Sequence, residues 1–191
     1  MNKVTLEDIM GIAAYEKIRD NFRRGIIGLK QKRRVALGSK VSLVFENRDT
    51  VIFQIQEMVR AERITDLDKI REEIEVYNGL IPEPGELSAT LFLEIADQTN
   101  LREELLQFLG VDEALSMRVG KHTIRARFEE GRSKEDKISA VQYVKFPFEP
   151  QEISAFAGAE DAELQIDHPN YHASARLDAG TRKSLLADLT S

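Results

Sequence analysis

The segment from Glu46 to Ile64 is apolar around most of the helix that its pattern predicts. At the helical period of about 3.6 residues it has two apolar faces, and the positions left for a solvated stripe are Gln56, Arg60 and Arg63. A helix with this pattern is buried on two sides. Its carboxylates, Glu57 and Glu62, then require a cation, a proton or a metal as a partner.

The flanking residues predict helices first and strands later. Residues 5–34 show helical spacing, with Gly25 and Gly28 allowing a neighbour to approach closely. Residues 35–46 alternate between apolar and polar side chains, which predicts a strand. Asn47 is suited to cap the central helix. Helices followed by a run of strands are typical of an α+β protein.

We therefore expect a single compact α+β domain over residues 1–191, in which N-terminal helices pack on a largely antiparallel sheet. Residues 1–80 are expected to be mainly helical with one strand. Residues 86–177 are expected to be mainly strands, and residues 180–190 to form a closing helix.

Composition excludes several kinds of site. The chain has no cysteine, so it neither ligates an iron–sulfur cluster itself nor forms a disulfide. A net charge of −6 argues against nucleic-acid binding. The residues that would carry such binding are Arg23, Arg24, Lys30, Lys32, Arg33 and Arg34.

The sequence also bears on localisation. No apolar stretch approaches the roughly 20 residues of a membrane span, and the N-terminal residues lack the apolar core of an export signal. We therefore expect a cytoplasmic protein that does not enter a membrane.

Four segments of the chain are together similar to a known bacterial family. They are ENRDTVIFQIQEMVRAE at 46–62, the PxPGELSATLF stretch at 82–92, ISAVQYVKF at 138–146 and HPNY at 168–171. TLEDIM and RRVALG near the N-terminus fit as well, so the chain resembles domain of unknown function 3501 from about residue 4 to residue 189. The resemblance brings no catalytic residues. Genes of the family often lie beside those for rubrerythrin-like proteins and cysteine-rich iron–sulfur oxidoreductases, so the resemblance implies a redox or oxidative-stress setting.

Glu57 and Glu62 are the first candidate catalytic residues. One interpretation is an ion-pair network with arginines nearby in the sequence, namely Arg48, Arg60 and Arg63. A second is a catalytic or metal-binding carboxylate, and a third, for Glu62, is exposure at the helix end. The metal-binding set that the sequence allows joins Glu57 or Glu62 with Glu86 and His168, although no Glu-x-x-His motif supports it.

Polar residues among the strands supply further candidates. Gln142 shares a strand face with apolar residues, so its amide bonds to neighbouring backbone, bonds to Gln54, or contacts a ligand. His168 and Tyr171 frame a His-Pro-Asn-Tyr turn, and His168 is also a candidate general acid because an imidazole exchanges protons near neutral pH. The candidate ligand-binding set is Arg48, Gln54, Glu57, Glu86, Gln142 and Tyr171.

Two functions fit these observations. The first is a cytoplasmic accessory protein that binds an iron–sulfur oxidoreductase or a rubrerythrin-like partner. The second is an enzyme that binds a metal or a small molecule in a carboxylate-centred pocket between the central helix and the sheet. The sequence contains no Walker loop and no Gly-x-Gly-x-x-Gly fingerprint, so it names no cofactor.

Overall fold

The computed structural model describes residues 1–96, 99–129, 133–134, 137–159 and 161–191. The N-terminal elements are η1 (Leu6–Asp8), α1 (Ile12–Lys32), β1 (Arg34–Leu37), β2 (Val41–Glu46), α2 (Arg48–Ala61) and α3 (Leu67–Asn78). The later helices are α4 (Leu101–Leu106), α5 (Val111–Ala114), α6 (Pro150–Gly158) and α7 (Ala179–Leu189). The later strands are β3 (Glu86–Leu93), β4 (Leu115–Val119), β5 (His122–Arg125), β6 (Arg127–Phe128), β7 (Ser133–Lys134), β8 (Lys137–Ile138), β9 (Val141–Pro147), β10 (Ala162–His168) and β11 (Tyr171–Arg176).

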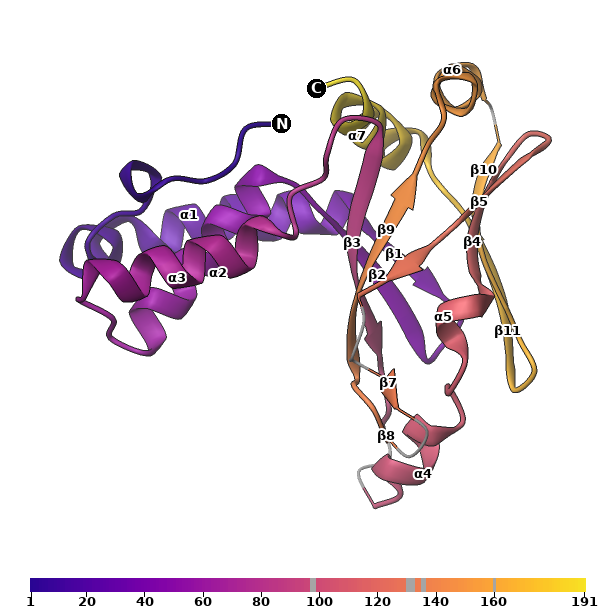
Figure 1. The fold of residues 1–191 in the computed structure, drawn as a ribbon, viewed down its shortest axis with the longest axis horizontal. Coiled ribbons are helices and arrows are strands. Elements are labelled where there is room, and N and C mark those ends of the chain that lie inside the picture. The colour runs from indigo at the N-terminus through magenta and orange to yellow at the C-terminus, as the bar shows by residue number, and fades with distance from the viewer. Residues whose placement is uncertain (97–98, 130–132, 135–136, 160) are drawn as a thin grey trace.

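The strands form two larger sheets, and helices α1, α2 and α3 lie together on one side of them (Figure 1). The strand order is β1-β2-β3-β9-β6 in the first sheet and β11-β10-β4-β5 in the second, while β7 and β8 form a short separate pair. The pairings among the described residues are antiparallel. The predicted antiparallel α+β fold is confirmed, but the strands divide into two sheets where the sequence predicted one.

The two sheets are linked along both edges. On one edge, β5 of the second sheet is followed by β6 of the first, with only Ala126 between them. The Ala126 N–H donates to the Leu115 carbonyl at 3.1 Å. On the other edge, the Tyr171 hydroxyl of β11 donates to the Leu37 carbonyl at the end of β1. The sheets therefore enclose a shared apolar interior.

Two groups of buried apolar side chains hold these layers together. The main core lies between the two sheets and includes residues of α6 and α7. A smaller helical core joins α2, α3 and the N-terminal segment, and its buried members are Val4, Val51, Ile55, Val59, Ile70, Ile74, Leu80 and Ile81. Burying each side chain of this size stabilises the fold by about 1.5–3 kcal/mol.

Helix α2 is the predicted central helix, and it begins as predicted. The Asn47 side chain accepts a hydrogen bond from the Thr50 N–H at 3.1 Å. Gln56 was predicted to be solvated, but it is fully buried because its amide accepts from the Met10 N–H at 2.9 Å and donates to the Met10 carbonyl at 2.8 Å. Of the interpretations left open for Glu62, the structure shows exposure at the helix end, since α2 ends one residue earlier and this side chain is exposed.

Candidate functional site

Glu57 lies between α2 and α1 in an ion pair. Its carboxylate accepts two hydrogen bonds from Arg19, at 2.8 Å each, and one from the Tyr15 hydroxyl at 2.7 Å. The bidentate bond from Arg19, helped by Tyr15, holds the pKa of Glu57 below its ordinary value, although partial burial opposes this effect. The ion-pair interpretation therefore describes Glu57, but the partner is Arg19 of α1 and none of the arginines near it in the sequence.

Two other candidates also face protein partners in the helical layer. The Arg48 guanidinium pairs with the Asp8 carboxylate at 2.6 Å, which ties α2 to the N-terminal segment. Gln54 makes a side-chain hydrogen bond with Tyr77 of α3. Burial raises the pKa of Tyr77, and the bond with Gln54 acts in the opposite direction. Both candidate residues thus stabilise contacts between N-terminal elements.

Gln142 is buried on the inner face of β9, and its amide donates to the Ser139 carbonyl at 2.8 Å. Of the alternatives that the sequence left open, this is the bond to neighbouring backbone. This bond ties the amide to the backbone just before β9, away from the outer face of the sheet.

His168 and Tyr171 flank a two-residue turn between β10 and β11. The buried His168 ring donates through Nε2 to the Leu109 carbonyl at 2.7 Å, and its Nδ1 accepts from the Asn170 N–H at 3.2 Å. The Tyr171 hydroxyl bonds to Leu37, as described above, and accepts from the Lys40 N–H at 3.2 Å. Both rings therefore anchor the turn to the rest of the fold.

The residues of the predicted metal set do not meet. Glu57 is bound by Arg19, Glu86 pairs with Lys145 at 2.6 Å, and His168 bonds to the backbone after α4. Among the residues that the structure describes, no three His, Asp or Glu side chains are grouped closely enough to hold a metal ion.

The basic run at the end of α1 is also dispersed. Arg33 is fully buried, where its guanidinium pairs with Asp188 of α7, and Arg34 pairs with Glu94 at 2.6 Å. Lys30 lies over the Phe53 ring at 5.9 Å. Three members of this run thus contact other parts of the protein.

A cleft of about 580 Å³ lies elsewhere, between the C-terminal end of α3 and the outer face of the five-stranded sheet. Helix α3 and the turn after it supply Tyr77, Leu80 and the apolar rim residue Val76. The sheet and the residue that follows β6 supply the polar residues, which are Glu86, Ser88, Arg127, Glu129, Tyr143 and Lys145. This cleft has the size and the mixture of apolar and polar groups of a small-molecule site.

The register of the sheet explains why these polar side chains meet. Arg127 of β6 pairs with Lys145 of β9, which in turn pairs with Ser88 of β3. Residues directly opposite one another in a sheet point to the same face. Glu86 lies two residues before Ser88 and therefore on the same face of β3. Its carboxylate accepts a hydrogen bond from the Lys145 ammonium at 2.6 Å.

Glu86 is the only candidate from the sequence that lines this cleft, and the helix beside it is α3 where the sequence indicated α2. The sequence did contain a sign of Lys145 and Tyr143, because they are two residues apart and therefore lie on one face of a mainly apolar strand, opposite its buried face. The sequence contained no sign of Arg127 and Ser88, since their meeting depends on the register of three strands that are far apart in the sequence.

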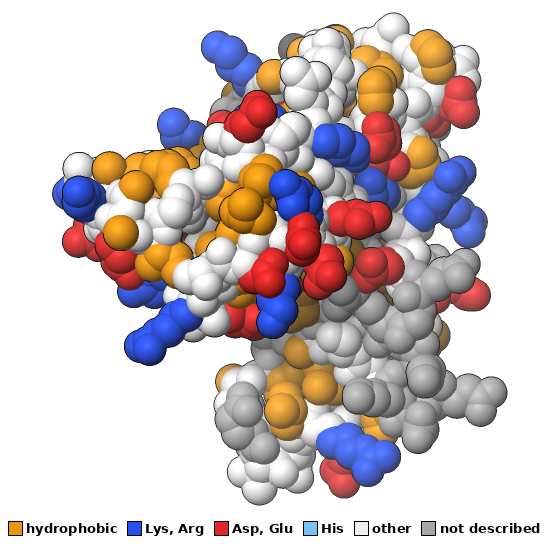
Figure 2. All heavy atoms as spheres, turned by 60° about the vertical axis from the view of Figure 1, so that its left-hand side comes forward, with side chains coloured by type: hydrophobic (Ala, Val, Ile, Leu, Met, Phe, Trp, Pro, Cys, Tyr) orange, Lys and Arg blue, Asp and Glu red, His pale blue; other side chains and the backbone are white. Residues whose placement is uncertain are grey.

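Figure 2 shows the face that carries the helices, where acidic and basic side chains alternate around apolar ones.

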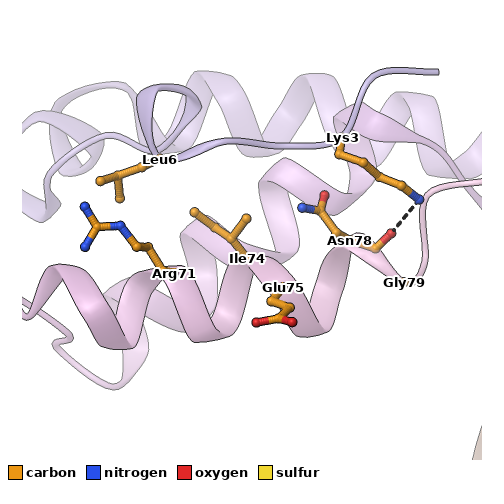
Figure 3. Close-up of a pocket in the computed structure, with 7 residues that line it drawn as sticks. All are labelled: Lys3, Leu6, Arg71, Ile74, Glu75, Asn78 and Gly79. Atoms are coloured by element: carbon orange, nitrogen blue, oxygen red, sulfur yellow. Dashed lines mark hydrogen bonds between the residues drawn. The ribbon is translucent and has the colours of Figure 1, made fainter.

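A second, shallower groove runs between the N-terminal segment and α3 (Figure 3). Lys3 and Leu6 form one side, and Arg71, Ile74 and Asn78 lie on the helix opposite. The Lys3 ammonium donates to the Asn78 carbonyl at 3.2 Å, which fixes the segment at one end of the groove. This groove is more open than the cleft, and its polar residues are Lys3, Arg71, Glu75 and Asn78.

The two antiparallel sheets with their layer of helices define an α+β protein. The family described as "protein of unknown function (DUF3501)" matches residues 3–189, and the chain belongs to this family. It is also similar to a solved protein of unknown function from Burkholderia pseudomallei, with a TM-score of 0.92 and 30% sequence identity over 98% of this chain and 100% of that one. No curated protein matches the chain. None of the helices in the described part of the chain combines the length and apolar character that crossing a bilayer requires.

Proposed function

We propose that the protein is a binding protein whose partner enters the cleft between α3 and the five-stranded sheet. The observation that carries this proposal is the cleft itself, a hollow of about 580 Å³ with a polar floor and an apolar wall. Val76 at its rim is 71% exposed, which is unusual for a large apolar side chain on a helix. A partner that enters the cleft would cover this side chain and remove its apolar surface from water.

We infer further that the partner belongs to a redox system. This inference is supported by the family resemblance, which implies that genes of the family often lie beside those for rubrerythrin-like proteins and iron–sulfur oxidoreductases. A chain without cysteine suits an accessory role, in which the partner supplies any iron–sulfur cluster.

The test compares two matched variants of α3. Val76→Asp places a charge at the rim of the cleft, whereas Leu67→Asp places one at the other end of the same helix, where Leu67 is 55% exposed. Affinity-tagged full-length protein should capture an iron–sulfur or rubrerythrin-like protein from native lysate, as identified by mass spectrometry. Val76→Asp should abolish the capture and Leu67→Asp should retain it. Recovery of the chain alone from cells that express such partners contradicts the proposal.

A second candidate function is an enzyme that uses the cleft for a small substrate. The observation that favours it is the Glu86–Lys145 pair, which places a carboxylate and an ammonium side by side in a hollow of suitable size. Metal analysis of the purified protein tests the metal-dependent form of this candidate. Stoichiometric iron, manganese or zinc that is lost in Glu86→Gln but retained in Glu57→Gln would support it.

A further inference from the structure

The floor of the cleft presents hydrogen-bond donors in one row across three strands. The Arg127 guanidinium, the Lys145 ammonium and the Ser88 hydroxyl belong to residues that are directly paired in the sheet. Side chains of directly paired residues have Cβ atoms only about 4.5–5.5 Å apart. Two cations and a hydroxyl are thereby directed to the same part of the cleft.

This row is only partly compensated by the protein itself. Glu86 accepts one hydrogen bond from Lys145, and an ammonium has three donors, so donors remain. Arg127 makes no ion pair with any residue in the described ranges. Like charges directly opposite one another in a sheet are destabilising, and a bound anion would relieve that repulsion.

Ser88 adds a hydroxyl to this row. The residue is only 2% exposed as a whole, and it lines the cleft beside Lys145. A hydroxyl can both donate and accept, so it offers a donor to a group that enters the cleft.

We propose that the cleft binds an oxyanion, a carboxylate or a phosphate, attached to an apolar or aromatic body. The oxyanion would accept from Lys145, Arg127 and Ser88, and the body would lie along Tyr77 and Leu80 on the α3 side. Glu86 and Glu129 also line the cleft and repel a second negative charge, so the ligand carries a single anionic group. This inference rests on the proposed function, because it names the chemistry that the cleft recognises.

Calorimetric or NMR titration of the full chain tests the inference with four probes of similar size. Benzoate and phenyl phosphate carry an oxyanion, benzyl alcohol is neutral and benzylamine is a cation. The two anions should bind measurably more tightly than the other two probes. Equal or tighter binding of benzylamine would overturn the inference.

Single substitutions test whether the anion binds to the row formed by Arg127, Lys145 and Ser88. Lys145→Met and Arg127→Gln should each weaken phenyl phosphate binding about tenfold, because each removes a charge-assisted hydrogen bond. The matched control is Arg125→Gln, which removes an exposed arginine from β5 outside the cleft and should leave the affinity unchanged. Equal affinities of all three variants and the unmodified protein would contradict the assignment.

Glu86→Gln distinguishes a ligand site from a structural ion pair. It frees the Lys145 ammonium without removing it, so anion affinity should rise several-fold. A fall in affinity with an unchanged melting temperature would count against the inference, and this variant stays informative even where Lys145→Met fails to fold.

A competition experiment identifies the source of the oxyanion and tests the oxyanion inference separately from the proposed function. If benzoate displaces a captured partner, the oxyanion is an acidic group of that protein. If benzoate binds without displacing the partner, the oxyanion is a free small acid; both results support the inference. Partner capture that depends on Val76 without binding of either anionic probe would overturn the oxyanion inference while leaving the proposed function standing.

Discussion

The environment of Glu57 illustrates how a half-buried carboxylate is stabilised at the scale of single residues. Arg19 and Tyr15, both from α1, donate the three hydrogen bonds that fix it. The same bond with Glu57, added to burial, raises the pKa of Tyr15 well above its ordinary value. The tyrosine therefore stays protonated and acts as a donor throughout the physiological pH range.

We predict that Glu57→Gln lowers the free energy of unfolding at pH 7 by about 1–3 kcal/mol. The folded-state pKa of Glu57 lies below its ordinary value of 4.5, so its contribution is complete above about pH 4.5 and is lost as the pH falls through the folded-state pKa. Urea denaturation at several pH values should show the gap between the two proteins closing as the solution becomes acidic. Glu62→Gln is the control, because Glu62 is exposed, and should change stability by less than about 0.5 kcal/mol. A gap that is the same at all pH values would contradict the assignment.

Gly38 supports a second prediction at this scale. Its φ of +69° is in the left-handed region, and a Cβ there would lie 2.4 Å from the Tyr171 hydroxyl oxygen. Gly38→Ala should therefore destabilise the protein by about 1–3 kcal/mol or more. Gly25→Ala is the matched control, since a Cβ on Gly25 meets nothing within 4 Å, and should stabilise α1 by about 0.5–1 kcal/mol. Thermal denaturation of both variants checks the opposite signs.

The contrast between these glycines shows what the sequence conveys about single residues. Gly25 and Gly28 were predicted to admit a close neighbour, but both face open space. Gly38 makes the close approach, to a tyrosine more than 130 positions later in the chain. Periodicity reveals which helix is buried, whereas the partner of a particular side chain is fixed by contacts that are distant in the sequence.

At the scale of elements, two amide side chains bind the N-terminal segment to the helical layer. Gln56 of α2 makes two hydrogen bonds with the backbone of Met10, and Asn78 of α3 makes two with the backbone of Val4, at 2.8 and 2.9 Å. Each amide replaces the backbone partner that a neighbouring strand would supply. The segment is thus held extended over the helical core.

We predict that Gln56→Ala releases the part of this segment around Met10. The variant leaves a backbone donor and acceptor without partners, which should cost about 1–3 kcal/mol of stability. Hydrogen exchange should accelerate at Met10 while Val4, held by Asn78, retains its protection. Gln31→Ala, on an exposed position of α1, should change neither quantity. Unchanged exchange at Met10 would show that other contacts hold the segment.

Element boundaries were predictable where their signals are local. Asn47 caps α2, and Gly120 with Lys121 forms the turn between β4 and β5, because the conformations of these residues depend on near neighbours. The division of the strands into two sheets was not predictable. Sheet order and register arise from pairings between distant segments, and the cleft residues Ser88, Arg127 and Lys145 meet only through them.

At the scale of the whole molecule, a buried ion pair joins the two halves of the chain. The Arg33 guanidinium at the end of α1 pairs with Asp188 of α7 and also donates to the carbonyls of Phe45 and Glu46, at 2.8 and 3.0 Å. Burial raises the pKa of Asp188, against the opposing effect of Arg33. The closing helix is thereby attached both to α1 and to the first sheet.

We predict that Asp188→Leu and Arg33→Met each lower the free energy of unfolding by about 3–5 kcal/mol, because either change leaves a buried charge without its partner. The double variant should lose much less than the sum. A double-mutant cycle measured by urea denaturation checks this coupling, with Arg71→Met as the control. Arg71 belongs to an exposed pair and should cost less than about 1 kcal/mol. Additive losses would mean that the two side chains act independently.

The connection between the two sheets at Ala126, which joins β5 to β6, has a practical consequence. Arg127, a cation of the cleft, is one residue away from a strand that the opposite sheet holds. Thr123 on that strand is exposed, and the chain has no cysteine, so Thr123→Cys would carry the sole thiol for a fluorescent or spin label. Thr123 does not line the cleft, so a label there would not compete for the site, and a change in its signal on addition of a probe would report that the cleft is occupied.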